Sequence, residues 1–160
     1  MQKEFSFKYE IFNSIDELNS EEKSLLEKAR QNTENAYAPY SQFNVSAVAL
    51  LENGTTIAAT NQENASYPVG ICAERTLLSA VSSLQPNQLI KTMAISYHNL
   101  NGNSGKPISP CGICRQSLLE YENRFQSSVK IIMSGLGGEV VVVESAKQLL
   151  PFSFSAEDMK

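Results

Sequence analysis

NVSAVALLENGTTIAAT, residues 44–60, consists of two apolar runs on either side of Asn53-Gly54. Asn-Gly between apolar runs is the strongest short-range signal for a β-hairpin, because both central residues of the favoured turn need a positive φ. The stretch therefore predicts two antiparallel strands, and it places a sheet at the centre of the fold.

The residues before this hairpin predict a helix that follows Asn19. Leu25, Leu26 and Ala29 share one face of this helix, as expected of an amphipathic segment that packs on a core. Asn19 is the expected N-cap, and Glu22 three residues later completes a capping-box pattern.

Helices and strands alternate after the hairpin. In chain order we expect a helix at 72–84, a strand at 90–97, a loop at 99–109, a helix at 111–121, strands at 129–135 and 139–145, and a short helix at 146–150. The strand at 129–135 is an apolar run that suits burial on both faces. A hairpin followed by alternating helices and strands predicts a mixed sheet covered by helices, which is a three-layer α/β architecture.

The composition predicts one globular domain over residues 1–160. The apolar fraction is 42%, the charged fraction is 19%, and the net charge of −4 is dispersed, which argues against a nucleic-acid partner. No apolar run approaches the roughly 20 residues that cross a bilayer. The first residues carry no signal-peptide pattern, so we expect no membrane partner and a cytoplasmic location.

Cys111 and Cys114 form a Cys-x-x-Cys pair at the start of a predicted helix. Ser109 is the expected N-cap of this helix, and Pro110 its first residue. Both thiols would then lie in the first turn, where free N–H groups favour thiolates. A redox dithiol and half of a metal site use this same geometry, so the pair alone leaves both open, whereas three cysteines argue against a disulfide framework.

Cys72 favours the metal site, because it opens the other predicted helix. Two helix starts that present three thiolates would form an incomplete tetrahedral zinc site. Three protein ligands are typical of catalytic zinc, whereas structural zinc normally takes four. His98, the only histidine, is the sole candidate for a fourth ligand, and we interpret it as a loop residue that follows a strand.

Glu74 and Arg75 follow Cys72 closely. An acidic residue at a helix start usually indicates a favourable dipole interaction, but near a zinc thiolate Glu74 is a candidate proton shuttle. Residues two apart do not share a helix face, so this role requires Cys72 at the very end of its helix. Arg75 lies three residues from Cys72 and is either a hydrogen-bond donor to ligand sulfurs or an exposed arginine.

Four segments together resemble the zinc-dependent cytidine deaminase family, specifically its small three-cysteine class. In chain order they are AYAPYSQFNVSAVAL (36–50), NQENASYPVGICAER (61–75), which contains CAER (72–75), PCGICRQ (110–116) and LLPFSF (149–154). The resemblance implies an α/β/α sandwich with a mixed central sheet.

The resemblance also implies an activity. Cys72, Cys111 and Cys114 match the ligands of one Zn²⁺, and Glu74 matches the proton shuttle. The implied reaction is hydrolysis of cytidine and 2′-deoxycytidine to uridine and 2′-deoxyuridine, with release of ammonia.

Contacts to the nucleoside are implied in the same way. Asn61 and Glu63 match the pair that holds the ribose hydroxyl. Phe43 matches the aromatic residue that packs on the pyrimidine ring, and the backbone of Ala73 is expected to hydrogen-bond the base.

Assembly is implied by two further aromatic residues. Tyr67 and Phe154 match residues that help to build a neighbouring subunit's site in a homotetramer. The catalytic blocks would then span approximately 36–116, and an assembly segment approximately 145–160.

Three alternatives stay open at this point. A structural zinc module would use His98 as its fourth ligand, but it leaves Glu74 unexplained. A deaminase of another substrate, such as the blasticidin type, conflicts with the nucleoside-type block NQENASY at 61–67. A nucleic-acid-editing deaminase is disfavoured by the net charge and the absence of a basic stripe.

The chain departs from the family pattern at two places. Asn44-Val45-Ser46 stands where Pro-Val-Gly is common, and Ala59-Thr60 stands where Gly-Cys is common. Both places lie in the predicted hairpin, so we expect an effect on strand packing more than on chemistry.

Overall fold

The predicted hairpin is formed by β2 (Phe43–Leu51) and β3 (Thr56–Thr60), which pair antiparallel in the computed structural model of residues 1–160. Gly54 in the connecting turn has a φ of +82°, a conformation that glycine adopts without steric cost, whereas Asn53 does not have the positive φ expected of both central residues. The Asn53 side chain accepts a hydrogen bond from the backbone N–H of Thr55 at 3.0 Å and closes the turn.

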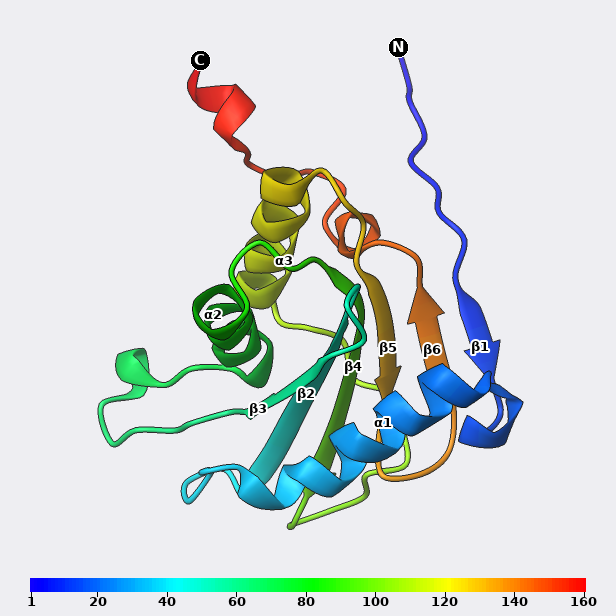
Figure 1. The fold of residues 1–160 in the computed structure, drawn as a ribbon, viewed down its shortest axis with the longest axis vertical. Helices are drawn as coiled ribbons and strands as arrows, with labels where there is room; N and C mark the ends of the chain where they lie inside the picture. The colour runs from blue at the N-terminus through cyan, green and yellow to red at the C-terminus, as the bar shows by residue number, and fades with distance from the viewer.

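Four further strands complete one sheet in the order β1-β6-β5-β4-β2-β3 (Figure 1). They are β1 (Glu10–Phe12), β4 (Ile90–Asn99), β5 (Lys130–Ser134) and β6 (Val140–Val143). β4 and β5 are parallel and all other neighbouring strands are antiparallel, so the predicted mixed sheet is confirmed. β1 was not predicted, because three residues are too few for an alternation to identify a strand.

Helices cover both faces of the sheet and make three layers (Figure 1). One face carries α1 (Ser20–Asn32), and the other carries α2 (Ala73–Leu84) and α3 (Gly112–Phe125). Side chains of β2 alternate between the two cores: Val48 and Leu50 pack with α1, whereas Ala47, Ala49 and Leu51 pack with α2 and α3. Burial of both faces explains why the central strands are continuous apolar runs.

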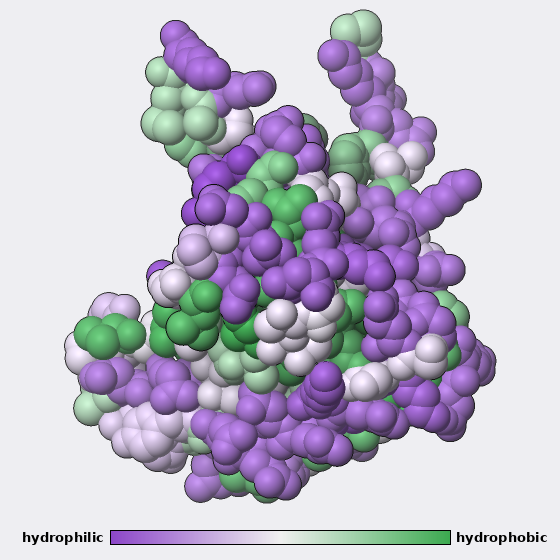
Figure 2. Space-filling view, viewed as in Figure 1, coloured by the Kyte–Doolittle hydropathy of each residue, from purple (hydrophilic) through white to green (hydrophobic).

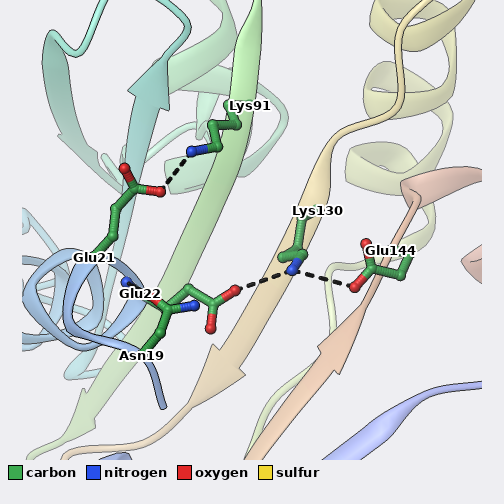
Figure 3. Close-up of polar contacts among 6 residues, drawn as sticks. All are labelled: Asn19, Glu21, Glu22, Lys91, Lys130 and Glu144. Carbon is green, nitrogen blue, oxygen red and sulfur yellow. Dashed lines mark hydrogen bonds and ion pairs between the residues drawn. The ribbon is translucent and has the colours of Figure 1, made fainter.

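Ion pairs fasten the first turn of α1 to the sheet (Figure 3). Asn19 Oδ1 accepts a hydrogen bond from the backbone N–H of Glu22 at 2.9 Å, as predicted for the N-cap. The Glu22 carboxylate does not return to Asn19, so the second half of the predicted capping box is wrong. It pairs instead with Lys130 Nζ of β5 at 3.0 Å, and Lys130 also meets Glu144 at 3.2 Å.

The two departures from the family pattern face each other. Ser46 of β2 lies opposite Thr60 of β3, and both are buried. Ser46 Oγ accepts a hydrogen bond from Asn32 Nδ2 at 2.9 Å, and Thr60 Oγ1 donates one to the Asn35 carbonyl at 3.2 Å. Both buried hydroxyls therefore have partners, which offsets the cost of removing them from water.

The surface visible in Figure 2 is mainly hydrophilic, with smaller apolar areas between the polar ones. Both chain ends project from the same end of the molecule (Figure 1). The C-terminal segment leaves Phe152 and Phe154 exposed, with 96% and 59% of their surface accessible. None of the helices combines the length and the apolar character needed to span a bilayer.

Candidate metal centre and active site

The three cysteines come together, although 39 residues separate Cys72 from Cys111. Cys72 Sγ lies 3.8 Å from Cys111 Sγ, which lies 3.5 Å from Cys114 Sγ, and all three sulfurs are within 4.8 Å of one another. A tetrahedral zinc with Zn–S bonds of about 2.3 Å holds its sulfurs about 3.8 Å apart. The donor set therefore fits Zn²⁺ with three protein ligands and one open position.

Helix N-termini favour thiolates at this cluster. Cys72 is the N-cap of α2, Cys111 is the N-cap of α3, and Cys114 lies in the first turn of α3. A hydrogen bond from Cys114 is the main cause that lowers the pKa of Cys72 to about 6. The same hydrogen bond and burial raise the pKa of Cys114. Of these two thiols, Cys72 is therefore the one that loses its proton more readily.

The start of α3 differs from the prediction. Ser109 does not cap the helix and Pro110 is not its first residue, because the cap is Cys111. The Pro110 carbonyl accepts a hydrogen bond from Arg115 Nε at 2.8 Å, in place of a helical N–H. The helix therefore begins two residues later than the sequence suggested.

Glu74 is buried beside the sulfurs, with 5% of its surface exposed. Burial raises the pKa of its carboxyl, and the negative charge of Glu74 raises the pKa of both Cys72 and Cys114. The geometric condition for the shuttle is met, since Cys72 caps α2. Arg75 makes no hydrogen bond to a sulfur within the chain, but its positive charge contributes to the low pKa of Cys72.

His98 is not part of the cluster. It lies inside β4, opposite Asn44 of β2, and not in a loop beyond the strand as predicted, because β4 continues to Asn99. The structural site with His98 as fourth ligand therefore does not form in this chain.

A short bridge brings the predicted ribose pair to the cluster. Gln62 exchanges two backbone hydrogen bonds with Ile71, at 2.9 and 3.0 Å, and Ile71 immediately precedes Cys72. Asn61 and Glu63 flank Gln62. The bridge therefore places both residues beside the segment that carries the first sulfur.

The Asn61 amide is bonded at both ends to β2. Its Oδ1 accepts a hydrogen bond from the Val45 N–H at 2.7 Å, and its Nδ2 donates one to the Phe43 carbonyl at 3.0 Å. The Phe43 ring in turn stacks on Tyr97 of β4, with centroids 4.8 Å apart and 15° between the planes. Asn61 therefore fixes the first residues of β2, including the aromatic residue predicted to contact the base.

Glu63 is held by a turn of the backbone. Its Oε2 accepts hydrogen bonds from the N–H groups of Tyr40 at 2.9 Å and Ser41 at 3.2 Å. Hydrogen bonding by Ser41 is the main cause that lowers the pKa of this carboxyl. Oε1 takes part in neither of these two backbone hydrogen bonds.

Residues 19–128 match the model of the family described as "Cytidine and deoxycytidylate deaminase zinc-binding region". This chain belongs to that family. The match includes all three cysteines of the cluster, so zinc is the metal of this deaminase.

Individual relatives extend the likeness over most of the deaminase. A cytidine deaminase of Halalkalibacterium halodurans is 35% identical over 135 residues, covering 84% of this chain and 95% of the relative. One of Sporosarcina psychrophila is 37% identical over 136 residues, covering 84% and 92%. The crystal structure of cytidine deaminase from Burkholderia pseudomallei has a TM-score of 0.70 at 33% identity, covering 82% and 97%. The predicted α/β/α fold and the enzyme class are thereby confirmed.

The remaining predicted site residues of the deaminase differ in exposure. Ala73 is fully buried at the start of α2. Tyr67 is 76% exposed, and its ring meets Tyr40 edge-on at 6.0 Å between centroids. Phe154 is 59% exposed, and its carbonyl accepts a hydrogen bond from Gln116 Nε2 at 2.8 Å.

Two residues of this region were missed by the sequence reasoning. Tyr97 stacks on Phe43 only because of the register between β2 and β4, and no local pattern signals it. Arg115 holds the segment before Cys111, and its only signal was its place directly after Cys114.

Proposed function

We propose that this deaminase converts cytidine and 2′-deoxycytidine into uridine and 2′-deoxyuridine and releases ammonia. The observation that carries the proposal is the cluster of three thiols at two helix N-termini, with Glu74 buried beside them. This is the donor set of a catalytic zinc with an adjacent acid–base group. Relatives named cytidine deaminase, of which the chain covers more than nine-tenths, support the choice of substrate.

Glu74 is the proposed proton carrier. When bound, zinc supplies a Lewis acid that lowers the pKa of water toward about 7. Glu74 takes one proton from the attacking water and gives it to N3 of the base, then passes the second to the amine that leaves C4. One water is consumed and one ammonia is released. Burial raises the pKa of Glu74, which brings the carboxyl closer to the neutral range where a shuttle is most effective.

Four residues are proposed to place the nucleoside. Glu63 Oε1 accepts a hydrogen bond from a ribose hydroxyl, and the second Nδ2 proton of Asn61 is available to the same sugar. Phe43 packs on the pyrimidine, and the backbone of Ala73 hydrogen-bonds the base. The Gln62–Ile71 bridge supports this arrangement, because it fixes the sugar pair beside the metal-binding segment.

The proposed assembly is a homotetramer of single-domain chains, residues 1–160, in which Tyr67 and Phe154 reach a neighbour's site. Exposure of both aromatic rings supports this proposal. We also infer a role in pyrimidine salvage, because the proposed reaction converts a cytosine nucleoside into a uracil nucleoside. A cytoplasmic location is proposed because a cluster of three free cysteines suits a compartment in which thiols stay reduced.

A nucleoside panel tests the proposed activity. Zinc-loaded protein is incubated with cytidine, 2′-deoxycytidine, adenosine, guanosine and blasticidin S, and the absorbance change of each is followed. We expect turnover of the two cytosine nucleosides only. Turnover of blasticidin S without turnover of cytidine would contradict the substrate assignment.

A further inference from the structure

The Arg115 side chain hydrogen-bonds the two residues that precede Cys111. Its Nε donates to the Pro110 carbonyl at 2.8 Å, and its Nη2 donates to Ser109 Oγ at 2.8 Å. Its backbone N–H donates to the carbonyl of Cys111 at 2.9 Å. Since Arg115 also directly follows Cys114, it is bonded to the chain on both sides of the Cys-x-x-Cys pair.

The same guanidinium reaches the C-terminal part of the chain. Arg115 Nη1 donates to the Leu149 carbonyl at 3.0 Å. The next residue, Gln116, donates to the Phe154 carbonyl at 2.8 Å. Farther along α3, the buried Glu122 carboxylate accepts hydrogen bonds from the 3₁₀ turn that carries Leu149; the donors are Ser145 Oγ and the N–H groups of Ala146 and Lys147. The segment 145–154 is therefore bonded along α3, from its last turns to its metal-binding end.

We propose that Arg115 positions the zinc ligands and couples them to residues 149–154, so that metal retention and the order of this segment depend on each other. A guanidinium carries its donors in one rigid plane, so three acceptors bonded to it are fixed relative to one another. If Leu149 moves, the plane rotates and the Pro110 carbonyl, one residue before the ligand Cys111, moves with it. Coupling of this kind acts equally in both directions.

This coupling reaches beyond the residues that the family model matches. The family match ends at residue 128, whereas Leu149 and Phe154 lie in the C-terminal segment. The proposal depends on the proposed function in one respect only, which is that zinc is the metal bound by the three cysteines. It assigns to the C-terminal segment a role at its own chain's metal centre, in addition to any contact with a neighbour.

Zinc release from the loaded protein tests the positioning role. The variants are Arg115→Met, Arg115→Lys and the control Arg124→Met. Arg124 lies on the same helix, where its guanidinium hydrogen-bonds Ser82 and lies over the Tyr121 and Phe125 rings. We expect Arg115→Met to lower zinc affinity about 10–100-fold, Arg115→Lys to recover part of the loss, and the control to match the parent. The thiolate and ligand-field absorption bands of the cobalt(II)-substituted protein should shift in Arg115→Met only.

Hydrogen exchange tests the coupling itself. Removal of zinc from the parent should speed exchange at 149–154 and at 111–115, while β5 and β6 stay protected. Gln116→Ala should speed exchange near residue 154 and lower zinc affinity by less than Arg115→Met does, because the bond from Arg115 to the Leu149 carbonyl remains. The comparison of zinc-loaded with zinc-free parent protein needs no variant, so it decides the proposal even where Arg115→Met does not fold.

Three results would overturn the proposal: parental zinc affinity and cobalt spectrum in a folded Arg115→Met protein, unchanged exchange at 149–154 after metal removal, or loss of protection spread evenly over the sheet. None of these readouts depends on which nucleoside reacts. A failed cytidine assay with intact coupling would therefore contradict the proposed function alone.

Discussion

Replacing Glu74 by glutamine separates proton transfer from the other contributions of this side chain. Glutamine is nearly isosteric, and Glu74 is not among the three sulfur ligands, so the fold and zinc content should persist. A proton shuttle contributes about 10²–10⁴-fold to turnover, which corresponds to about 2.7–5.4 kcal/mol of activation free energy. A carboxylate that only stabilises a helix start contributes about 0.3–1 kcal/mol of stability and nothing to turnover.

The Glu74→Gln substitution should lower activity without lowering the stability of the metal-free protein. Because burial raises the pKa of Glu74, the folded state favours its neutral form. Above the ordinary pKa of a carboxyl, the unfolded chain is ionised at no cost, whereas the folded chain must ionise a buried group. A neutral amide removes this cost, so the metal-free Glu74→Gln protein should unfold at a temperature no lower than the parent at neutral pH.

The assay is turnover of cytidine by protein that metal analysis and circular dichroism show to be loaded and folded. Glu22→Gln is the matched control, since Glu22 lies in the first turn of α1 and pairs with Lys130. It should lose stability and keep turnover. Activity of Glu74→Gln within a few-fold of the parent would refute the shuttle.

Three further predictions follow from the site. His98→Ala should leave zinc content unchanged, because His98 lies in β4 outside the sulfur cluster; metal analysis that finds zinc lost would contradict the open coordination position. Asn61→Ala and Glu63→Ala should each lower kcat/KM for cytidine, by an amount that corresponds to about 1–3 kcal/mol of lost transition-state stabilisation. The reason is that a sugar hydroxyl or its partner is left unpaired. Free cytosine should be a poor substrate, and equal turnover of cytosine and cytidine would disprove this pair's role. Removal of residues from Pro151 onward should lower both tetramer content in sedimentation and activity, and a fully active monomer would count against the shared site.

Features with a local cause were predicted well from the sequence. The hairpin follows from Asn53-Gly54, and the apolar face of α1 follows from helical spacing. The placement of all three cysteines at helix starts was also predicted, because an apolar helical pattern follows each of the two segments.

Features decided by distant partners were not predicted. The Glu22 carboxylate does not complete the capping box because it forms an ion pair with Lys130 of β5 at 3.0 Å. α3 begins at Gly112 and not at Pro110 as predicted, and the Pro110 carbonyl accepts a hydrogen bond from the Arg115 side chain and not from a helical N–H. In each case two groups competed for one partner, and only the folded arrangement decides which group is nearer.

The position of the site follows from the direction of β4. Short connections join the end of α2 to the start of β4 and the end of α3 to the start of β5, which is parallel to β4. Both helices therefore run opposite to β4, so their N-termini point toward the end of the sheet at which β4 finishes. At this end Phe43, the first residue of β2, pairs with Asn99, the last residue of β4. Contacts of Asn61 with Phe43 and of Gln62 with Ile71 link this start of β2 to the segment before Cys72, and carboxyl ends of strands in open α/β sheets are where ligands bind. The sulfur cluster and the stacked Phe43 ring are therefore connected through two short segments, and both helices that carry the sulfurs run opposite to the strand that pairs with Phe43.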